Sequence, residues 1–358
     1  MRQTIGIAEN GAWLYNGDGL FFEAFKTQKH VKEETMNLRK VNIGILGIGN
    51  VGTGTVQALE MNRAAIEKST RREIRVKKIL ARDLTKKRDV ELPEGVLTTD
   101  PTEIICSPEI DIVVELLGGI NPATDYMLNA LNNGKHVVTA NKAALAASYD
   151  RLLETAKENG VSILFEASVA GGIPIINAIS TVLRGNQFDE ISGIVNGTTN
   201  YILTQMTDFG LAYEDVLKTA QEKGFAEADP TADVCGFDAA NKLSILMALV
   251  FDKYVHPDSI PTEGITNIRL SDIEAAKSAN SKIKLLATAK NENGKISYAV
   301  KPTLIPSDHP LAGVSNEFNA VFVRGNAVGE LMFYGKGAGP LPTGSAVLGD
   351  IITLAEMI

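Results

Sequence analysis

From residue 36 onward, short apolar runs alternate with longer stretches in which apolar residues recur every three or four positions. The first run, 41–46, is followed by a stretch that places Val56, Leu59 and Ile66 on one helical face. Alternation of this kind is typical of a parallel sheet covered by helices. The pattern predicts an α/β fold, with further strands over 75–81, 110–117, 134–139 and 162–165 and a helix over 122–133.

The pattern changes after about residue 170. A strand is predicted over 191–195, a helix from near Tyr201, and a helix that is apolar nearly all round over 243–251. Residues 262–330 alternate apolar and polar positions in short segments, which indicates a mixed sheet. We therefore expect a second, α+β domain over 171–330. Residues 331–358 then form a return segment, with a helix from Ser345 that packs on the first domain.

The segment 1–35 lacks this periodicity and also lacks the basic-then-apolar layout of a signal peptide. We expect it to be an extension outside the main fold, with Met36 as the natural start of the chain. Packing of this segment on the domain surface is the alternative.

A glycine-rich turn joins the first predicted strand to the first helix. Gly47, Gly49 and Gly52 form a G-x-G-x-x-G pattern that encloses Asn50 and Val51. Such glycines make a tight turn, let the pyrophosphate approach the backbone and let the helix pack on the strand, while helix N–H groups hold the anion. The motif alone is weak and could be a turn of another α/β protein, but its place between strand and helix favours a Rossmann-type dinucleotide-binding domain over 36–170.

The second predicted strand ends in Arg82 and Asp83, where a dinucleotide fold selects its cofactor. An acidic side chain there favours a free ribose 2′-hydroxyl, whereas an arginine accommodates a 2′-phosphate. Because basic residues follow at 86–88, the sequence slightly favours NADP over NAD. A solvated basic loop is the alternative.

The most informative segment is an acidic cluster, Glu227, Asp229, Asp233 and Asp238, followed one helical turn later by Lys242. The lysine begins the apolar helix, so the cluster should be partly buried, and buried charge is costly unless it is paired or used. An exposed i,i+4 pair, worth a few tenths of a kcal/mol, is the alternative.

Two further segments place reactive or anion-binding groups at predicted strand ends. Lys142 follows the strand 134–139, where ligands of open α/β sheets bind, although a solvated lysine is common there. Asn196, Gly197 and Thr198 follow the strand 191–195 and could present N–H groups to a carboxylate. Plain helix capping by Thr199 or Asn200 is the alternative for that segment.

Composition narrows the class of protein. A chain of 358 residues suggests two domains, and a net charge of -8 with a pI near 5.2 argues against nucleic acid or an anionic membrane as partner. Two distant cysteines and four scattered histidines make a zinc site improbable and predict a reducing, cytoplasmic location. No apolar run reaches membrane-spanning length.

Taken together, these motifs resemble homoserine dehydrogenase from about residue 41 to residue 358. Several motifs in the same order carry the resemblance: 139–142, 166–169, 196–200, 224–230, 238–242 and 337–339. It implies an NAD(P)-dependent oxidoreductase that interconverts L-homoserine and L-aspartate 4-semialdehyde in threonine, methionine and isoleucine biosynthesis. It also implies a dinucleotide-binding domain, a mixed-sheet substrate and dimerisation domain, and a homodimer.

The resemblance assigns roles to matching positions. Lys242 and Lys142 are similar to the family's two active-site lysines, and Lys242 is the usual candidate for proton transfer. The substrate contacts that it implies are Glu227, Asp233 and Asp238, and the backbone of Gly197 and Thr198 suits the α-carboxylate of homoserine. The glycine motif and the strand ends predict the cofactor contacts Gly47, Gly49, Asn50, Val51, Gly52, Arg82, Gly118 and Lys142, and the resemblance adds Gly224 and Gly339 or Gly337. The family's sodium site, bound through backbone carbonyls, matches Glu166, Val169, Gly171 and Ile173.

Many members of this family carry a C-terminal domain that senses threonine, so for a chain ending at Ile358 we expect no threonine control through such a domain. Two other functions remain open at this stage. Aspartate-semialdehyde dehydrogenase needs a nucleophilic cysteine, but Cys106 has the look of a loop residue and Cys235 lies beside the acidic cluster. A non-catalytic NAD(P)-binding sensor would bind cofactor without turnover.

Overall fold

The computed structural model describes residues 3–8, 11–15, 20–24 and 38–358, in two compact units, Met1–Leu38 and Arg39–Ile358. In the first unit, β1 (Gln3–Ala8), β2 (Gly11–Tyr15) and β3 (Leu20–Ala24) form an antiparallel sheet in the order β1-β2-β3. The expectation that 1–35 is an extension stays a prediction, and Met36 lies outside the described residues. No helix in the described ranges is long and apolar enough to cross a membrane.

The second unit begins with a six-stranded parallel sheet in the order β6-β5-β4-β7-β8-β9, which confirms the predicted α/β fold class. All strands run in one direction, so their carboxyl ends lie along one edge. Gly47, Arg82, Gly118 and Lys142 each come one to three residues after a strand and therefore lie along that edge. The strands are β4 (Arg39–Leu46), β5 (Arg72–Leu80), β6 (Leu97–Thr98), β7 (Ile112–Glu115), β8 (His136–Thr139) and β9 (Ile163–Leu164).

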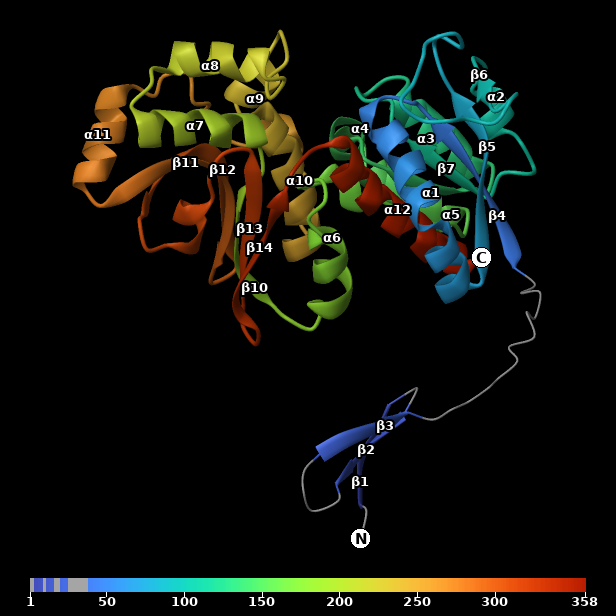
Figure 1. Cartoon of the computed structure of the whole chain (residues 1–358). Coiled ribbons are helices and arrows are strands. Elements are labelled where there is room, and N and C mark those ends of the chain that lie inside the picture. The colour runs from blue at the N-terminus through green and yellow to red at the C-terminus, as the bar shows by residue number, and fades with distance from the viewer. Residues whose placement is uncertain (1–2, 9–10, 16–19, 25–37) are drawn as a thin grey trace. The chain divides into compact units, whose positions relative to one another are not determined.

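Helices cover both faces of this sheet. On one face α1 (Asn50–Thr70) and α12 (Pro340–Met357) lie side by side (Figure 1), and their buried side chains share a core with β4, β5 and β7. The prediction that the last helix begins at Ser345 is wrong, because Pro340 and Pro342 occupy its first turn, where a missing N–H costs nothing. The other helices of this half are α2 (Thr102–Ile105), α3 (Ala123–Asn132), α4 (Lys142–Ala147) and α5 (Tyr149–Glu158).

The second sheet has the order β12-β11-β10-β13-β14, with antiparallel neighbours and one parallel bridge between Thr262 and Val300. Within 262–330, where the alternation predicts only strands, residues Leu270–Ser278 form a helix, α11, whose buried Ile273 and Ala276 lie one turn apart. The strands are β10 (Phe188–Ile194), β11 (Ser281–Glu292), β12 (Lys295–Pro306), β13 (Phe318–Gly325) and β14 (Gly329–Lys336).

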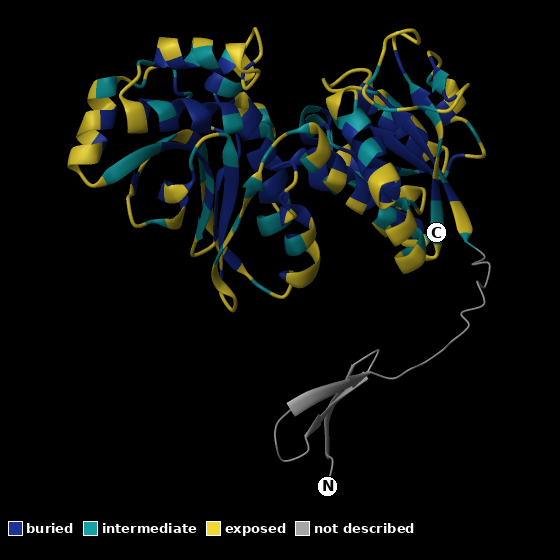
Figure 2. Cartoon of the chain, viewed as in Figure 1, coloured by how far each residue is buried: buried dark blue, intermediate teal, exposed yellow. Residues whose placement is uncertain are grey.

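One face of this sheet is covered by helices whose buried side chains share a core with the half of the unit that contains the parallel sheet, called here the first half. The apolar helix α10 (Phe237–Phe251) contacts both α4 and β11, and its buried residues belong to one cluster with residues of β7, β8 and β10. Figure 2 shows the inner strands of both sheets, such as β7 and β10, buried and the outer sides of α8 and α11 exposed, whereas the edge strands β12 and β14 are mostly intermediate or exposed. The remaining helices are α6 (Ile175–Asn177), α7 (Gly197–Phe209), α8 (Tyr213–Glu222) and α9 (Thr231–Val234).

Candidate active site

The centre of the site is the carboxylate of Asp238, which lies between two ammonium groups. Its Oδ1 is 2.9 Å from Nζ of Lys142, and its Oδ2 is 2.7 Å from Nζ of Lys242. Asp238 is 5% exposed and Lys242 is 7% exposed, so the alternative of a solvated surface pair is wrong. Lys142 comes from the edge of the first sheet and the other two residues come from α10, so this contact joins the two halves of the unit.

Lys242 lies one turn after Asp238 on α10, as its spacing predicts, and its Nζ also donates to the carbonyl oxygen of Val195 at 2.6 Å. Burial lowers the pKa of Lys242, Asp238 opposes that shift, and the nearby charge of Lys142 adds to it. The pKa of Lys242 therefore lies below its ordinary value. A buried lysine of this kind can give up its proton nearer neutral pH than a solvated one.

The pKa of Lys142 is shifted in the opposite direction to that of Lys242. It is the first residue of α4, and its side chain is 42% exposed. The negative charge of Asp238 raises the pKa of Lys142 and outweighs the partial burial that lowers it. Lys142 thus stays protonated while Lys242 is the easier of the two to deprotonate, and such a separation assigns acid and base roles within a site.

Asp238 is held ionised by its partners. Burial alone would raise the pKa of its carboxyl group, but the ammonium groups of Lys242 and Lys142 and a hydrogen bond from Asn196 hold it below the ordinary value. The carboxylate is thus the fixed negative charge against which both lysines are placed.

Asn196 connects the acidic residues through its side chain, a role that the sequence did not predict. Its Nδ2 donates to Asp233 Oδ1 at 2.7 Å and to Asp238 Oδ2 at 2.9 Å, while its Oδ1 accepts from Thr199 N at 2.9 Å. Asn196 is therefore the N-cap of α7, and the alternative of capping by Thr199 or Asn200 is wrong. The helix begins at Gly197, four residues before the predicted start near Tyr201.

The predicted substrate residues converge on this cluster. Thr198 Oγ1 lies 3.0 Å from Asp233 Oδ2 and 2.7 Å from the carbonyl oxygen of Phe225, which brings the segment 224–230 against the start of α7. Gly197 and Thr198 occupy the first turn of α7, where backbone N–H groups lack a helical partner. Glu227 is exposed, and its charge contributes to the raised pKa of Lys142, so it faces the same region.

The glycine-rich turn has the geometry that a dinucleotide requires. Gly47 has a φ of 109°, and a Cβ at Gly52 would lie 2.4 Å from the Gly47 carbonyl oxygen, so both positions require glycine. Gly49 is the N-cap of α1, and no described acceptor takes the N–H groups of Asn50, Val51 or Gly52. These free N–H groups fit the pyrophosphate of a dinucleotide.

The residues after β5 and β7 complete this edge. Asp83 Oδ1 accepts hydrogen bonds from Thr85 N at 2.8 Å and Thr85 Oγ1 at 2.7 Å, so its carboxylate is used inside its own turn. Arg82 is exposed and forms no hydrogen bond or ion pair within the described residues. Gly118 has a φ of 82° and Gly224 a φ of 75°, and both have open space around the position of a Cβ.

The predicted metal loop lies against the predicted cofactor loop of the return segment. A Cβ on Gly171 would lie 2.4 Å from the carbonyl oxygen of Gly337, and Gly172 N donates to Lys336 O at 3.2 Å. Gly339 follows as the N-cap of α12.

The Glu166 side chain is not available to a metal, because its two oxygens accept from Ile176 N at 2.9 Å and Asn177 N at 2.7 Å. Among the four carbonyl oxygens of the predicted site, those of Val169 and Gly171 accept no hydrogen bond from the described part of the chain and fit a cation, whereas those of Glu166 and Ile173 accept from Val169 N at 3.4 Å and Ile175 N at 2.8 Å. Within the same described part, no group of three His, Cys, Asp or Glu side chains could hold a metal ion.

Comparisons with known proteins give one consistent result. Residues 47–166 match the family model "Homoserine dehydrogenase, NAD binding domain", and residues 174–352 match "Homoserine dehydrogenase". The chain is similar to a homoserine dehydrogenase of Bacillus subtilis, with 45% identity over 319 residues that cover 89% of this chain and 74% of the relative.

Two solved structures support the same relationship. A homoserine dehydrogenase from Thiobacillus denitrificans superposes with a TM-score of 0.87 at 44% identity, covering 90% of this chain and 74% of the other. A hyperthermophilic archaeal homoserine dehydrogenase in complex with NADPH superposes with a TM-score of 0.74 at 30% identity, covering 89% of this chain and 98% of the other.

The buried pair gives a stability prediction. Asp238→Ala leaves the Lys242 ammonium buried without its carboxylate, so we expect the free energy of unfolding to fall by about 3–5 kcal/mol in urea denaturation. The double variant Asp238→Leu with Lys242→Met removes both charges and should recover most of that loss. The exposed control Asp189→Ala should change stability by less than about 0.5 kcal/mol. A wild-type unfolding midpoint for Asp238→Ala would contradict the buried pairing.

Proposed function

The chain belongs to the homoserine dehydrogenase family, and from that premise we propose which of its own residues carry the reaction. The protein is an NAD(P)-dependent oxidoreductase that interconverts L-homoserine and L-aspartate 4-semialdehyde in aspartate-family amino-acid biosynthesis. One observation carries the proposal: the buried Asp238 carboxylate binds Lys142 and Lys242 through different oxygens, and the two lysines have opposite pKa shifts.

In the oxidising direction, Lys242 accepts the proton of the homoserine hydroxyl, because its pKa is the lowered one. Lys142 stays charged and stabilises the negative charge that develops on the same oxygen. The nicotinamide ring, when bound, supplies the acceptor for the hydride from the carbinol carbon. In the reducing direction, Lys242 returns the proton to the oxygen of the semialdehyde.

The substrate's charged groups fit the remaining residues. Homoserine carries an ammonium and an α-carboxylate, so the site needs one anionic and one N–H-rich region. We assign the ammonium to Glu227 and Asp238, with Asp233 held behind them by Asn196. The N–H groups of Gly197 and Thr198, at the start of α7, take the α-carboxylate.

Lys242→Met tests the proton-transfer role, because it keeps an unbranched side chain in the core of α10 and removes the base. We expect kcat for homoserine oxidation to fall by about 10²–10⁴-fold, while the Kd of NADPH, followed by nicotinamide fluorescence, stays unchanged. Lys135→Met is the matched control, since Lys135 is also buried but donates to Ser107 O and Ile110 O, near the opposite edge of the first sheet. Cofactor binding without turnover in the wild type would favour the sensor function instead.

The pH dependence of kcat tests the role of Lys142. Lys242 must be neutral to accept a proton, so homoserine oxidation should rise with pH as Lys242 loses its proton, below the usual lysine value of 10.5. Lys142→Met removes a like charge, which raises the pKa of Lys242 and should move the rising part of the pH profile to higher pH. Lys142→Arg keeps the charge and should leave the pH profile in place. An unchanged pH profile in Lys142→Met would show that the lysines are not coupled.

We also propose that NADP(H) is the preferred cofactor. The Asp83 carboxylate is occupied inside its own turn, whereas Arg82 is exposed beside it and available to a 2′-phosphate. Gly47 to Gly52 would hold the pyrophosphate, and Gly118, Gly224, Gly337 and Gly339 would let the backbone approach the rest of the cofactor.

Arg82→Ala should therefore raise the KM for NADP⁺ by roughly 10- to 100-fold, the loss expected for a charged hydrogen bond, and leave the KM for NAD⁺ unchanged. Lys68→Ala, an exposed cation in the last turn of α1, far from the glycine-rich turn, is the control. Equal effects on both cofactors would contradict a contact to the 2′-phosphate.

Na⁺ is the cation that we propose for the loop Glu166, Val169, Gly171 and Ile173, held by their carbonyl oxygens. The residues Ala170 and Gly171 have φ values of 56° and 55°, which turn the backbone sharply at this point. Because Na⁺ would bind the folded protein, the midpoint of thermal unfolding should be higher in NaCl than in choline chloride at equal ionic strength. Identical midpoints would contradict the site.

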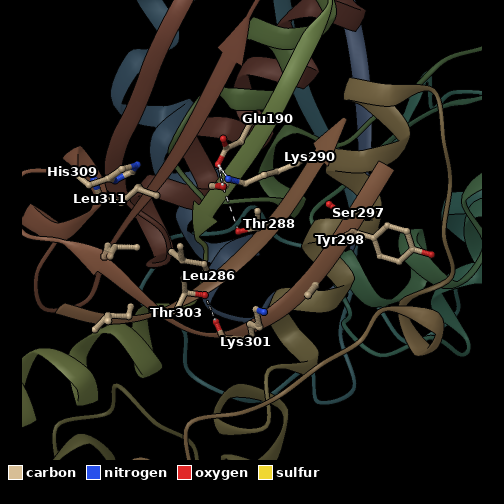
Figure 3. Close-up of a pocket in the computed structure, with 14 residues that line it drawn as sticks. Glu190, Leu286, Thr288, Lys290, Ser297, Tyr298, Lys301, Thr303, His309 and Leu311 are labelled. Atoms are coloured by element: carbon tan, nitrogen blue, oxygen red, sulfur yellow. Dashed lines mark hydrogen bonds and ion pairs between the residues drawn. The ribbon is translucent and has the colours of Figure 1, made fainter. Parts of the chain in front are cut away.

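A homodimer through the second sheet is also proposed. Alternation along β11 places Leu285, Ala287 and Ala289 in the main core and turns Leu286 and Thr288 to the opposite face. That face contains a hollow of about 540 Å³ lined mainly by β10, β11 and β12 (Figure 3), and Leu304, one of its lining residues, is 54% exposed. A second copy would cover these groups, and sedimentation velocity tests this by giving twice the 38.4 kDa of one chain.

A further inference from the structure

Glu115 is a buried carboxylate that the reaction as described does not use. It is the last residue of β7 and is fully buried. Its Oε1 accepts from Leu117 N at 2.7 Å and, over a longer 3.4 Å, from Asn141 Nδ2, while Oε2 accepts from Thr139 Oγ1 at 2.8 Å. Each of these partners can donate a hydrogen bond to the carboxyl group of Glu115.

The partners of Glu115 lead directly to Lys142. Thr139 Oγ1 accepts from Asn141 N at 2.9 Å, so one hydroxyl links the carboxylate to the backbone just before the lysine. Asn141 Oδ1 accepts from Ala144 N at 3.2 Å and thereby caps α4, of which Lys142 is the first residue. The backbone N–H and the side chain of Asn141 are thus both hydrogen-bonded, and together they fix the backbone at Lys142.

The same group fixes the turn after β7. Leu117 N is bonded to Glu115, and Asn141 Nδ2 donates to Gly119 O at 2.7 Å. Gly118 and Gly119 both have positive φ values, 82° and 72°, so this turn has few side-chain contacts of its own to hold it. The carboxylate therefore joins two segments at the carboxyl edge of the sheet, where the cofactor and Lys142 meet.

A carboxylate is a costly way to fill this position. Burial raises the pKa of Glu115 above its ordinary value, and hydrogen bonds from Leu117, Thr139 and Asn141 offset only part of that rise. An apolar residue at the end of a buried strand would avoid the cost of removing a polar or charged group from water. What an apolar residue could not do is accept several hydrogen bonds from two separate segments.

We propose that Glu115 is a positioning residue that holds Lys142 in its reactive arrangement through Thr139 and Asn141. This inference rests on the role assigned to Lys142 above. Because Glu115 acts through Lys142, removing it should matter only while the lysine is present, since residues that act as one unit show non-additive effects.

The test is a double-mutant cycle of Glu115→Gln and Lys142→Ala, with kcat for homoserine oxidation as the readout. Glu115→Gln keeps the size of the side chain but replaces one acceptor oxygen by a donor facing Thr139. We expect kcat to fall by about 10- to 100-fold, the cost of a small misplacement of a reacting group. In the Lys142→Ala background, the same substitution should produce no further fall.

Thr139→Val serves as a second variant, because it removes the hydroxyl link and leaves the carboxylate in place. It should lower kcat in the same non-additive way, so the test does not depend on Glu115→Gln being well folded. The matched control is Lys135→Met, a buried polar residue of the same sheet outside this network. It should leave kcat unchanged in both backgrounds even where it lowers the unfolding temperature.

Two outcomes overturn different claims. If Glu115→Gln lowers kcat by the same factor with and without Lys142, the residue acts on the fold in general and the inference fails, while the role of Lys142 stands. If Lys142→Ala alone retains the wild-type kcat, the proposed role of Lys142 fails and the inference fails with it.

Discussion

The site depends on one constraint, a single buried carboxylate shared by two lysines. Asp238 has two oxygens and gives one to Lys142 and one to Lys242. Burial lowers the pKa of Lys242, and Asp238, whose one negative charge is shared with Lys142, offsets that effect only in part. The chemistry of the site follows from this imbalance, because it separates a lysine that stays charged from one that exchanges its proton.

The fold provides this arrangement by bringing three segments together. Lys142 comes from the end of β8, Asp238 and Lys242 come from the first turns of α10, and Asn196 comes from the end of β10. The helix α10 is apolar on nearly all sides because it packs between the second sheet and α4 of the first half. Core packing and catalytic geometry therefore depend on the same helix.

Much of this could be predicted from the sequence, and the exceptions have physical reasons. The glycine turn and the Asp238–Lys242 spacing are local patterns, and the structure has both. The link from Asn196 to Asp233 and Asp238 is non-local, and a capping asparagine looks like an ordinary helix start. In the sequence, Glu115 is only one polar residue at the end of an apolar run, and its role depends on Thr139 and Asn141, which are distant in sequence. Backbone carbonyl groups cannot be predicted as ligands from residue types, because every residue has one.

The position of α12 has a consequence for how the chain is made. Its residues Val347, Ile351 and Leu354 complete the core that β4 and α1 begin some 300 positions earlier. A ribosome releases β4 and α1 long before it has made α12, so one face of the first sheet stays incompletely covered until synthesis ends. The second half, residues 171–336, is continuous in sequence and can acquire its core first. The order of synthesis and the order of completion thus run in opposite directions for the two halves.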